Sequence, residues 1–237
     1  MGLYDRNYIG NKTEQGAFSS SQAQTRTKSE LGLFIKQTYQ LFAASLLAAT
    51  AGAYVGLGMA QTISNWFIAI VILEFALLFG LYAVKKKPGI NMIVLFGFTF
   101  VSGLTLAPLL TTILGMAGGG AIVANAFMLT TVAFGGLSVF AMNTKKDFTV
   151  MGKMLFVTLI VVVVASLINI FLGSPIMQLA IASISAVLFS AFILYDTQNI
   201  IKGAYETPIE GAIALYLDFL NLFVALLQIL GIFNSDD

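Results

Sequence analysis

The chain of 237 residues contains no cysteine and no histidine. These absences exclude disulfide bonds, thiolate nucleophiles and imidazole bases, and they remove nearly every zinc or haem site. Charged residues make up only 10% of the chain, whereas hydrophobic residues make up 58%. So few polar groups cannot cover the surface of a soluble globular protein, and the composition therefore predicts a protein that resides in lipid. The net charge of +1 offers no basic face to nucleic acid, so no nucleic-acid partner is expected.

Long apolar runs account for most of the chain. Each run is about 20 residues long, which is enough for a helix to cross the hydrocarbon core of a bilayer. The runs are continuous rather than alternating, which argues against the strands of a β-barrel. The sequence therefore predicts an all-α integral membrane protein, a bundle of seven transmembrane helices. In the first run, Gly52 and Gly56 favour a close approach to a neighbouring helix. The runs lie near residues 37–60, 64–84, 90–112, 119–142, 154–172, 176–200 and 211–233.

The distribution of charge predicts the domain boundary and the orientation. Residues 1–30 are polar, and we expect them to form a flexible cytoplasmic tail before one transmembrane domain at residues 31–237. The lysines and arginines lie in or just after this tail and in alternate loops, around residues 85–87, 145–153 and 202. By the positive-inside rule the N-terminus is therefore cytoplasmic, and seven crossings place the C-terminus on the other side of the membrane.

Three carboxylates fall inside the apolar runs, where a charge is costly and normally faces a partner or a water-filled cavity. Glu74 is midway along the second run, and we interpret it as a residue of a pore or ion site, with a purely structural role left open. Asp196 lies near the end of the sixth run and Asp218 about two turns into the seventh. The sixth and seventh helices are antiparallel and joined by a short loop, so Asp196 and Asp218 are expected to meet near the cytoplasmic side.

A close pair of aspartates has a distinctive response to protons. At a separation of about 5 Å and an effective dielectric constant near 20, two carboxylates repel by roughly 3 kcal/mol. Such a pair shares one proton and titrates as a unit, so Asp196 and Asp218 are predicted to act as a pH sensor and gate. When ionised, they also offer oxygen ligands that suit Ca²⁺. The alternative is that both residues are interfacial or hold a structural hydrogen bond. No organic cofactor is expected.

A longer pattern surrounds these aspartates. It runs through Ile193–Gln198 and Gly211–Leu215 and ends in Tyr216–Phe223. Together with Phe100–Pro108, this pattern closely resembles the Bax inhibitor-1 family, and the resemblance covers roughly residues 33–237. It is specific, because it combines several separated segments in one order.

The resemblance implies a fold in which the last helix is surrounded by the other six. It also implies a pH-dependent calcium leak gated by two aspartates, which map onto Asp196 and Asp218. The basic residue that latches the closed state through the first aspartate maps onto Lys85, where close bacterial relatives have arginine. Lysine is a point charge and cannot donate in the two-pronged manner of arginine, which makes a bidentate latch doubtful. A bacterial inner membrane is the expected location.

Two other functions stay open. Bacterial relatives are linked to a membrane-anchored AAA protease, so the chain is alternatively an interaction protein that modulates such a protease without conducting ions, with residues 1–30 as its contact. Two facing aspartates also leave intramembrane aspartyl proteolysis open. The sequence shows no pair of nucleophile and base, and we therefore expect no enzymatic activity.

Overall fold

The computed structural model describes residues 26–235, and within this range the chain folds into helices without any strand. Seven segments are long and apolar enough to span a membrane, which confirms the predicted bundle. Two helices, α4 and α5, form the third span, and a short 3₁₀ helix at Thr149–Met151 precedes α7 in the fifth. The α-helices are α1 (Lys28–Leu57), α2 (Ala60–Asn65), α3 (Phe67–Val84), α4 (Ile90–Thr105), α5 (Ala107–Leu114), α6 (Gly119–Asn143), α7 (Gly152–Leu172), α8 (Pro175–Ile201) and α9 (Pro208–Ser235).

The first helix begins at Lys28 rather than near residue 37. Thr27 and Glu30 form a capping box, in which the Thr27 side chain accepts the N–H of Glu30 and the Glu30 carboxylate accepts the N–H of Thr27 at 2.8 Å. The additional turns mix polar residues such as Lys28, Glu30 and Lys36 with apolar ones, so a continuous apolar run does not reveal them. Residues 1–25 of the predicted tail lie outside the described residues.

The third span is interrupted at Leu106, between α4 and α5. Pro108 has no N–H to donate to the carbonyl of Leu104, and its ring crowds that carbonyl, so the helix cannot continue unbroken. The N–H of Leu106 bonds to the carbonyl of Gly103 at 3.2 Å in a tighter turn. The interruption places Thr105, the last residue of α4, beside Glu74 of α3.

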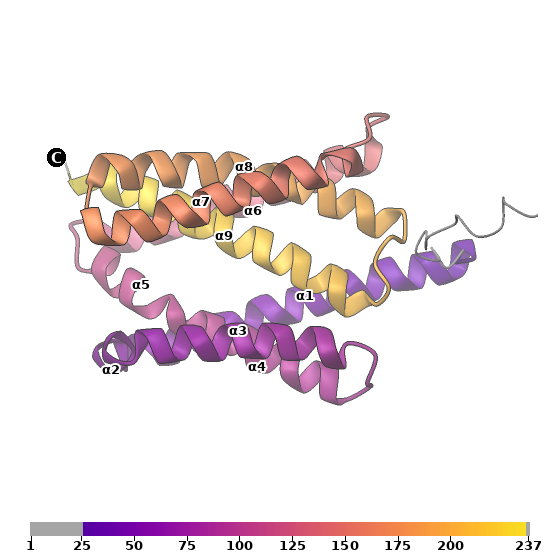
Figure 1. Ribbon diagram of the computed structural model, residues 1–237, viewed down its shortest axis with the longest axis horizontal. Coiled ribbons are helices and arrows are strands. Elements are labelled where there is room, and N and C mark those ends of the chain that lie inside the picture. The colour runs from indigo at the N-terminus through magenta and orange to yellow at the C-terminus, as the bar shows by residue number, and fades with distance from the viewer. Residues whose placement is uncertain (1–25, 236–237) are drawn as a thin grey trace, which may run out of the picture.

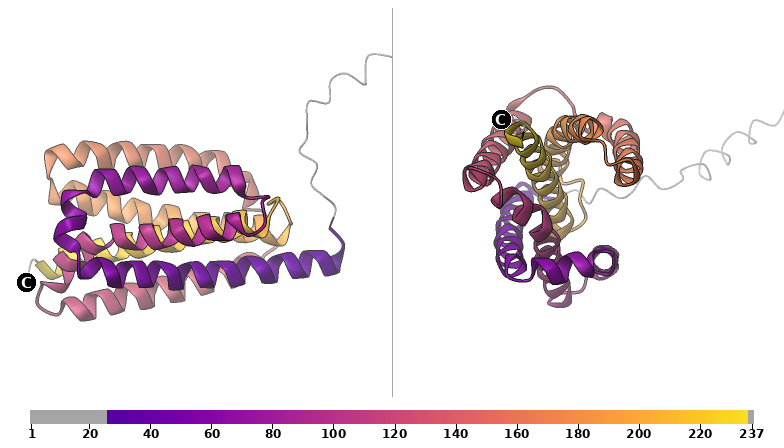
Figure 2. Two further views of the ribbon diagram at one scale, coloured as in Figure 1. Left: turned by 90° about the horizontal axis from the view of Figure 1, so that it is seen from below. Right: turned by 90° about the vertical axis from the view of Figure 1, so that its left-hand side faces the viewer.

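Helix α9 runs through the centre of the bundle, as the resemblance implies. It packs against α1, α4, α6 and α8, with α7 and α8 on one side and α3 and α4 on the other (Figures 1 and 2). Half of its most apolar stretch is buried, compared with 6% for α3. Stacked and edge-on rings of Phe42, Phe134 and Phe219 join α1, α6 and α9, with centroids 4.9–6.0 Å apart. Helix α3, by contrast, packs mainly against α4.

Glycines allow α1 and α4 to approach until their backbones touch. A Cβ atom added to Gly52 would lie 2.0 Å from the carbonyl oxygen of Phe100, and one added to Gly103 would lie 2.0 Å from that of Ala49. Gly56 is also buried against α5, where an added Cβ would lie 2.7 Å from Ala107. The close approach predicted for Gly52 and Gly56 is confirmed.

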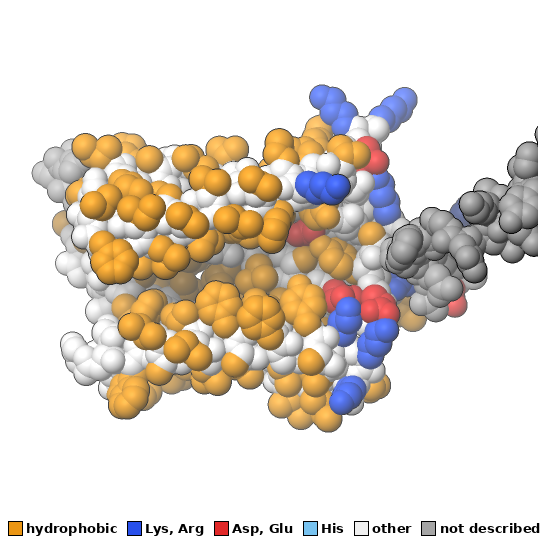
Figure 3. Space-filling model, in the orientation of Figure 1, with side chains coloured by type: hydrophobic (Ala, Val, Ile, Leu, Met, Phe, Trp, Pro, Cys, Tyr) orange, Lys and Arg blue, Asp and Glu red, His pale blue; other side chains and the backbone are white. Residues whose placement is uncertain are grey.

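Basic side chains gather at one end of the bundle, which we call the basic end (Figure 3). The start of α1 lies at this end, and the C-terminus of α9 lies at the opposite end (Figure 1). Apolar side chains cover the flank between the two ends (Figure 3). This arrangement is that of a multi-pass membrane protein, and the basic end is the one that the positive-inside rule predicts to be cytoplasmic.

The contact between α1 and α4 gives a test of the fold. Gly103→Ala should destabilise the protein by about 1–3 kcal/mol, because the new methyl group meets backbone that cannot move aside. Gly97→Ala, in the same helix, is the matched control, because a Cβ atom there meets nothing within 4 Å. Both free energies of unfolding are measured by titrating the detergent-solubilised protein with a denaturing detergent. Equal stability of the two variants would contradict the close contact.

Candidate functional site

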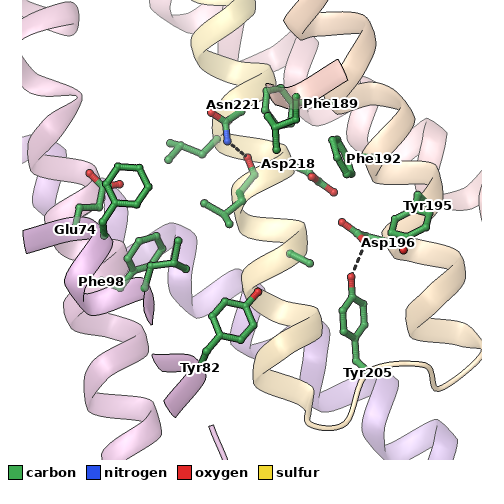
Figure 4. Close-up of a pocket in the computed structure, with 16 residues that line it drawn as sticks. Glu74, Tyr82, Phe98, Phe189, Phe192, Tyr195, Asp196, Tyr205, Asp218 and Asn221 are labelled. Atoms are coloured by element: carbon green, nitrogen blue, oxygen red, sulfur yellow. Dashed lines mark hydrogen bonds between the residues drawn. The ribbon is translucent and has the colours of Figure 1, made fainter. Parts of the chain in front are cut away.

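A cavity of about 610 Å³ separates α3 from α8 and α9 and reaches toward the basic end (Figure 4). The flank of the bundle is hollowed between the two groups of helices, with acidic atoms inside the hollow (Figure 3). The lining contains three carboxyl groups among mostly aromatic and aliphatic side chains. The lining residues are Glu74, Phe75, Leu78, Tyr82, Phe98, Leu159, Phe189, Phe192, Tyr195, Asp196, Tyr205, Ala214, Leu217, Asp218, Leu220 and Asn221.

The structure brings Asp196 and Asp218 together. Helices α8 and α9 form an antiparallel hairpin whose loop spans residues 202–207, so the two aspartates come to the same depth. Their side chains point toward each other at the cavity (Figure 4) and interact directly. Their relative exposures are only 6% and 3%. Oδ2 of Asp218 has no hydrogen-bond partner among the described residues.

Tyr205, in the loop between α8 and α9, is a partner that the sequence analysis missed. Its hydroxyl donates a hydrogen bond of 2.5 Å to Oδ1 of Asp196. Burial, together with the nearby Asp196 carboxyl group, raises the pKa of Tyr205, so the phenol stays protonated and acts as a donor. The short loop between the two helices could have indicated Tyr205 as this partner, because a tyrosine in such a loop has few directions in which to bury its ring.

Glu74 lies on the opposite wall of the cavity, on α3 (Figure 4). The hydroxyl of Thr105 is 3.1 Å from Oε2 of Glu74 and 2.7 Å from the backbone carbonyl of Ser102. The carboxyl group is therefore anchored where the third span is interrupted. The cavity thus joins Glu74 with the two aspartates, which the sequence identified separately.

Lys85, the predicted latch, is not paired with Asp196 in this structure. Its Nζ atom lies 2.5 Å from Oε1 of Glu210 and 3.1 Å from Oε2 of Glu206. The hydrogen bond to Glu210 raises the pKa of Lys85. Lys86 pairs with the other oxygen of Glu206 and thereby lowers the pKa of that carboxyl group. These ion pairs tie the end of α3 to the start of α9, and we call them the α3–α9 strap.

Glu210 holds its position through the start of α9. Its Oε2 accepts the backbone N–H groups of Glu206 and Thr207 at 2.9 and 3.0 Å, while the Thr207 hydroxyl accepts the N–H of Glu210. This is a capping box, and Pro208 follows the cap at a position where helices tolerate proline. The spacing Thr207-Pro-Ile-Glu210 carries this pattern in the sequence, although the sequence analysis did not use it.

Arg26 also holds the loop between α8 and α9, through contacts with its backbone. Its guanidinium donates to the backbone carbonyls of Gly203, Tyr205 and Glu206 at 2.8–3.0 Å. It also lies over the ring of Phe34, 4.0 Å from the centroid. The sequence analysis treated Arg26 only as a charge that sets orientation, whereas here it positions the loop that carries Tyr205.

The two aspartates by themselves do not complete a metal site. Within residues 26–235, no three His, Cys, Asp or Glu side chains gather closely enough to hold a metal ion. Ca²⁺ prefers six to eight oxygen ligands, and two aspartates supply only part of that number. The aspartate pair, the predicted Ca²⁺ ligands, therefore supplies only part of a coordination shell for this ion.

The chain is similar to one known protein family and to several known proteins. The family described as "Inhibitor of apoptosis-promoting Bax1" matches residues 31–235. The chain is 59% identical to an uncharacterized protein of Campylobacter jejuni, with 99% of this chain and 100% of that protein covered. It is 40% identical to an uncharacterized membrane protein of Vibrio cholerae, covering 90% and 97%. It is also 36% identical to the Golgi anti-apoptotic protein of vaccinia virus, covering 68% and 67%.

The α3–α9 strap is testable by a double-mutant cycle. Lys85→Met and Glu210→Gln should show a coupling free energy of about 1 kcal/mol in unfolding, because the pair is partly shielded from solvent. Lys87→Met combined with Glu210→Gln is the control, since Lys87 forms no ion pair among the described residues. A coupling no larger than that of the control would mean that the strap does not hold.

The clamp by Arg26 predicts a local effect. Arg26→Gln should increase amide hydrogen exchange in residues 202–207, because three carbonyl contacts of that loop are lost. Lys28→Gln is the matched control, because Lys28 is exposed and makes no side-chain contact with this loop. Hydrogen exchange followed by mass spectrometry measures both. Unchanged exchange in the Arg26 variant would contradict the clamp.

Proposed function

The chain belongs to the Bax inhibitor-1 family, and on this premise we propose that it is a pH-sensitive leak pathway for Ca²⁺, with Asp196 and Asp218 as pH sensor and gate. The observation that carries the proposal is the contact of two buried carboxyl groups in a cavity that also holds Glu74. Its expected location is the bacterial inner membrane, with the N-terminus in the cytoplasm.

The pH response of the aspartate pair follows from electrostatics. Two ionised carboxylates within about 5 Å repel by roughly 3 kcal/mol, so the neighbouring groups share a proton at low pH. As the pH rises, the pair loses this proton, repels itself and attracts cations. Flux should therefore increase with pH. The groups that face the pair are Glu74 and Tyr82 from α3, Tyr195 from α8 and Tyr205 from the loop.

The ion pairs at the basic end are poor candidates for the sensor. The pKa of Lys85 is raised, so its stabilising contribution is complete below its ordinary pKa of about 10.4 and is lost only as pH rises through the higher value. The pKa of Glu206 is lowered, so its contribution is present above its ordinary value of about 4.3 and is lost as pH falls through the lower value. Both groups stay charged near neutral pH, and the chain has no histidine. The carboxyl groups of the cavity are therefore the better candidates for a sensor that titrates near neutral pH.

An apolar layer toward the end opposite the basic end is the reason that we propose a slow leak instead of an open channel. Beyond Asp218, α9 packs its next turns into an apolar cluster that includes Leu110, Ile122, Phe223 and Leu227. An ion that reaches the aspartates therefore meets a closed apolar layer. Passage requires a displacement of these helices, and repulsion within the ionised pair supplies a force that acts on α8 and α9.

Calcium flux in proteoliposomes tests this function. Wild-type protein should carry Ca²⁺ into vesicles loaded with a fluorescent indicator, and the rate should increase between about pH 6 and pH 8. The double variant Asp196→Asn with Asp218→Asn should lose the pH dependence, because neither amide titrates in this range. Asp147→Asn is the control, since Asp147 is paired with Lys202 outside the cavity and the hydrogen bond to Lys202 lowers its pKa to about 2.

Two results would contradict the proposal. A pH profile that survives in the double variant would remove the aspartates from the sensor. Flux no greater than that of empty vesicles at any pH would favour the second function, in which the chain modulates a membrane-anchored AAA protease without conducting ions. In that case, deletion of residues 1–25 should change the rate of proteolysis.

A further inference from the structure

The cavity offers an unusual combination of an unpartnered acidic group and aromatic walls. Asp218 lines the cavity, and its buried Oδ2 atom has no hydrogen-bond partner among the described residues. A buried polar atom without a partner is costly, which points to a ligand that approaches it from the cavity. Besides Tyr205, six aromatic side chains line the cavity with the carboxyl groups: Phe75, Tyr82, Phe98, Phe189, Phe192 and Tyr195.

Among the described residues, no basic side chain lines the cavity to offset its carboxyl groups. Among the described residues that line it, the ionisable groups are carboxyl and phenol groups, and none is lysine or arginine. Lys85, the predicted latch, is held by Glu210 and Glu206 in the α3–α9 strap. A ligand that carries a positive charge of its own therefore complements this cavity when its carboxyl groups are ionised.

The aromatic walls select among cations. Ca²⁺ is strongly hydrated and takes oxygen ligands, so it gains little from rings and aliphatic side chains. A quaternary ammonium or phosphonium group is weakly hydrated and is attracted to the faces of aromatic rings. The cavity volume of about 610 Å³ falls in the range of small-molecule sites.

The position of the cavity provides a route from the bilayer. The hollow opens on the apolar flank of the bundle (Figure 3), and Phe75 and Tyr82 on its border are 55% and 47% exposed. A hydrophobic cation dissolved in the membrane reaches this opening without passing through water. We propose that the cavity is a binding site for hydrophobic organic cations, which enter from the bilayer and place their charge against Asp218 and Asp196 between the aromatic walls.

Binding of tetraphenylphosphonium to the purified full-length protein in detergent tests this proposal. The radiolabelled cation should bind saturably above the background of empty micelles. Asp218→Asn should weaken binding by about tenfold or more, because it removes the charge that the cation meets. Asp147→Asn should leave binding unchanged, because Asp147 lies outside the cavity and pairs with Lys202. Tetraphenylborate, which has the same shape and the opposite charge, should fail to compete.

A second variant keeps the test decisive if Asp218→Asn does not fold. Phe192→Leu preserves an apolar side chain and removes one aromatic face, so affinity for tetraphenylphosphonium should fall several-fold. No saturable binding, equal competition by tetraphenylborate, or unchanged affinity in both variants would overturn the proposal. This assay measures no ion flux, so its failure and the failure of the calcium leak are distinguishable.

Discussion

The burial of two carboxyl groups against each other constrains the rest of the structure. An ionised carboxylate loses most of its hydration at such a position, and the protein can offset that loss with a counter-charge, a hydrogen-bond donor or water. This chain supplies a phenol, Tyr205, and a cavity, whereas it directs Lys85 to Glu210 outside the pair. The loop that carries Tyr205 is in turn held by Arg26. The clamp, the strap and the open space beside α3 are therefore connected consequences of one costly burial.

The unequal packing of the helices determines which helix can move most easily. Helix α9 packs against α1, α4, α6 and α8, and its displacement would disturb all of them. Helix α3 packs mainly against α4 and faces the cavity with residues such as Glu74 and Tyr82. Its basic end is tied to α9 by ion pairs and by the buried side chain of Leu81, which lies near Ile209 and Ile213. A movement of α3 costs less than a movement of α9, so α3 is the wall whose position controls the width of the cavity.

Hydropathy predicts the seven spans because lipid imposes one dominant requirement, an apolar surface of fixed thickness. The same requirement does not identify helical turns in which charged and apolar residues alternate with each other, so the start of α1 at Lys28 was missed. The hairpin geometry made the meeting of Asp196 and Asp218 predictable, since two antiparallel helices with a short loop leave little freedom in depth. The partner of Lys85 was not predictable in this way, because a long flexible side chain reaches several carboxylates and the choice depends on how α3 tilts.

The two proposed occupants of the cavity are linked by the group they share. In the two proposals, Ca²⁺ and a hydrophobic cation both use the carboxyl group of Asp218, whose buried Oδ2 has no hydrogen-bond partner among the described residues. The organic cation gains attraction from the aromatic walls that Ca²⁺ does not. It also fills space that an ion would cross on its way from Glu74 to the aspartates. If both proposals hold, an organic cation bound from the bilayer blocks the passage of Ca²⁺ through the cavity. The content of such cations in the membrane then determines which fraction of the protein can conduct Ca²⁺.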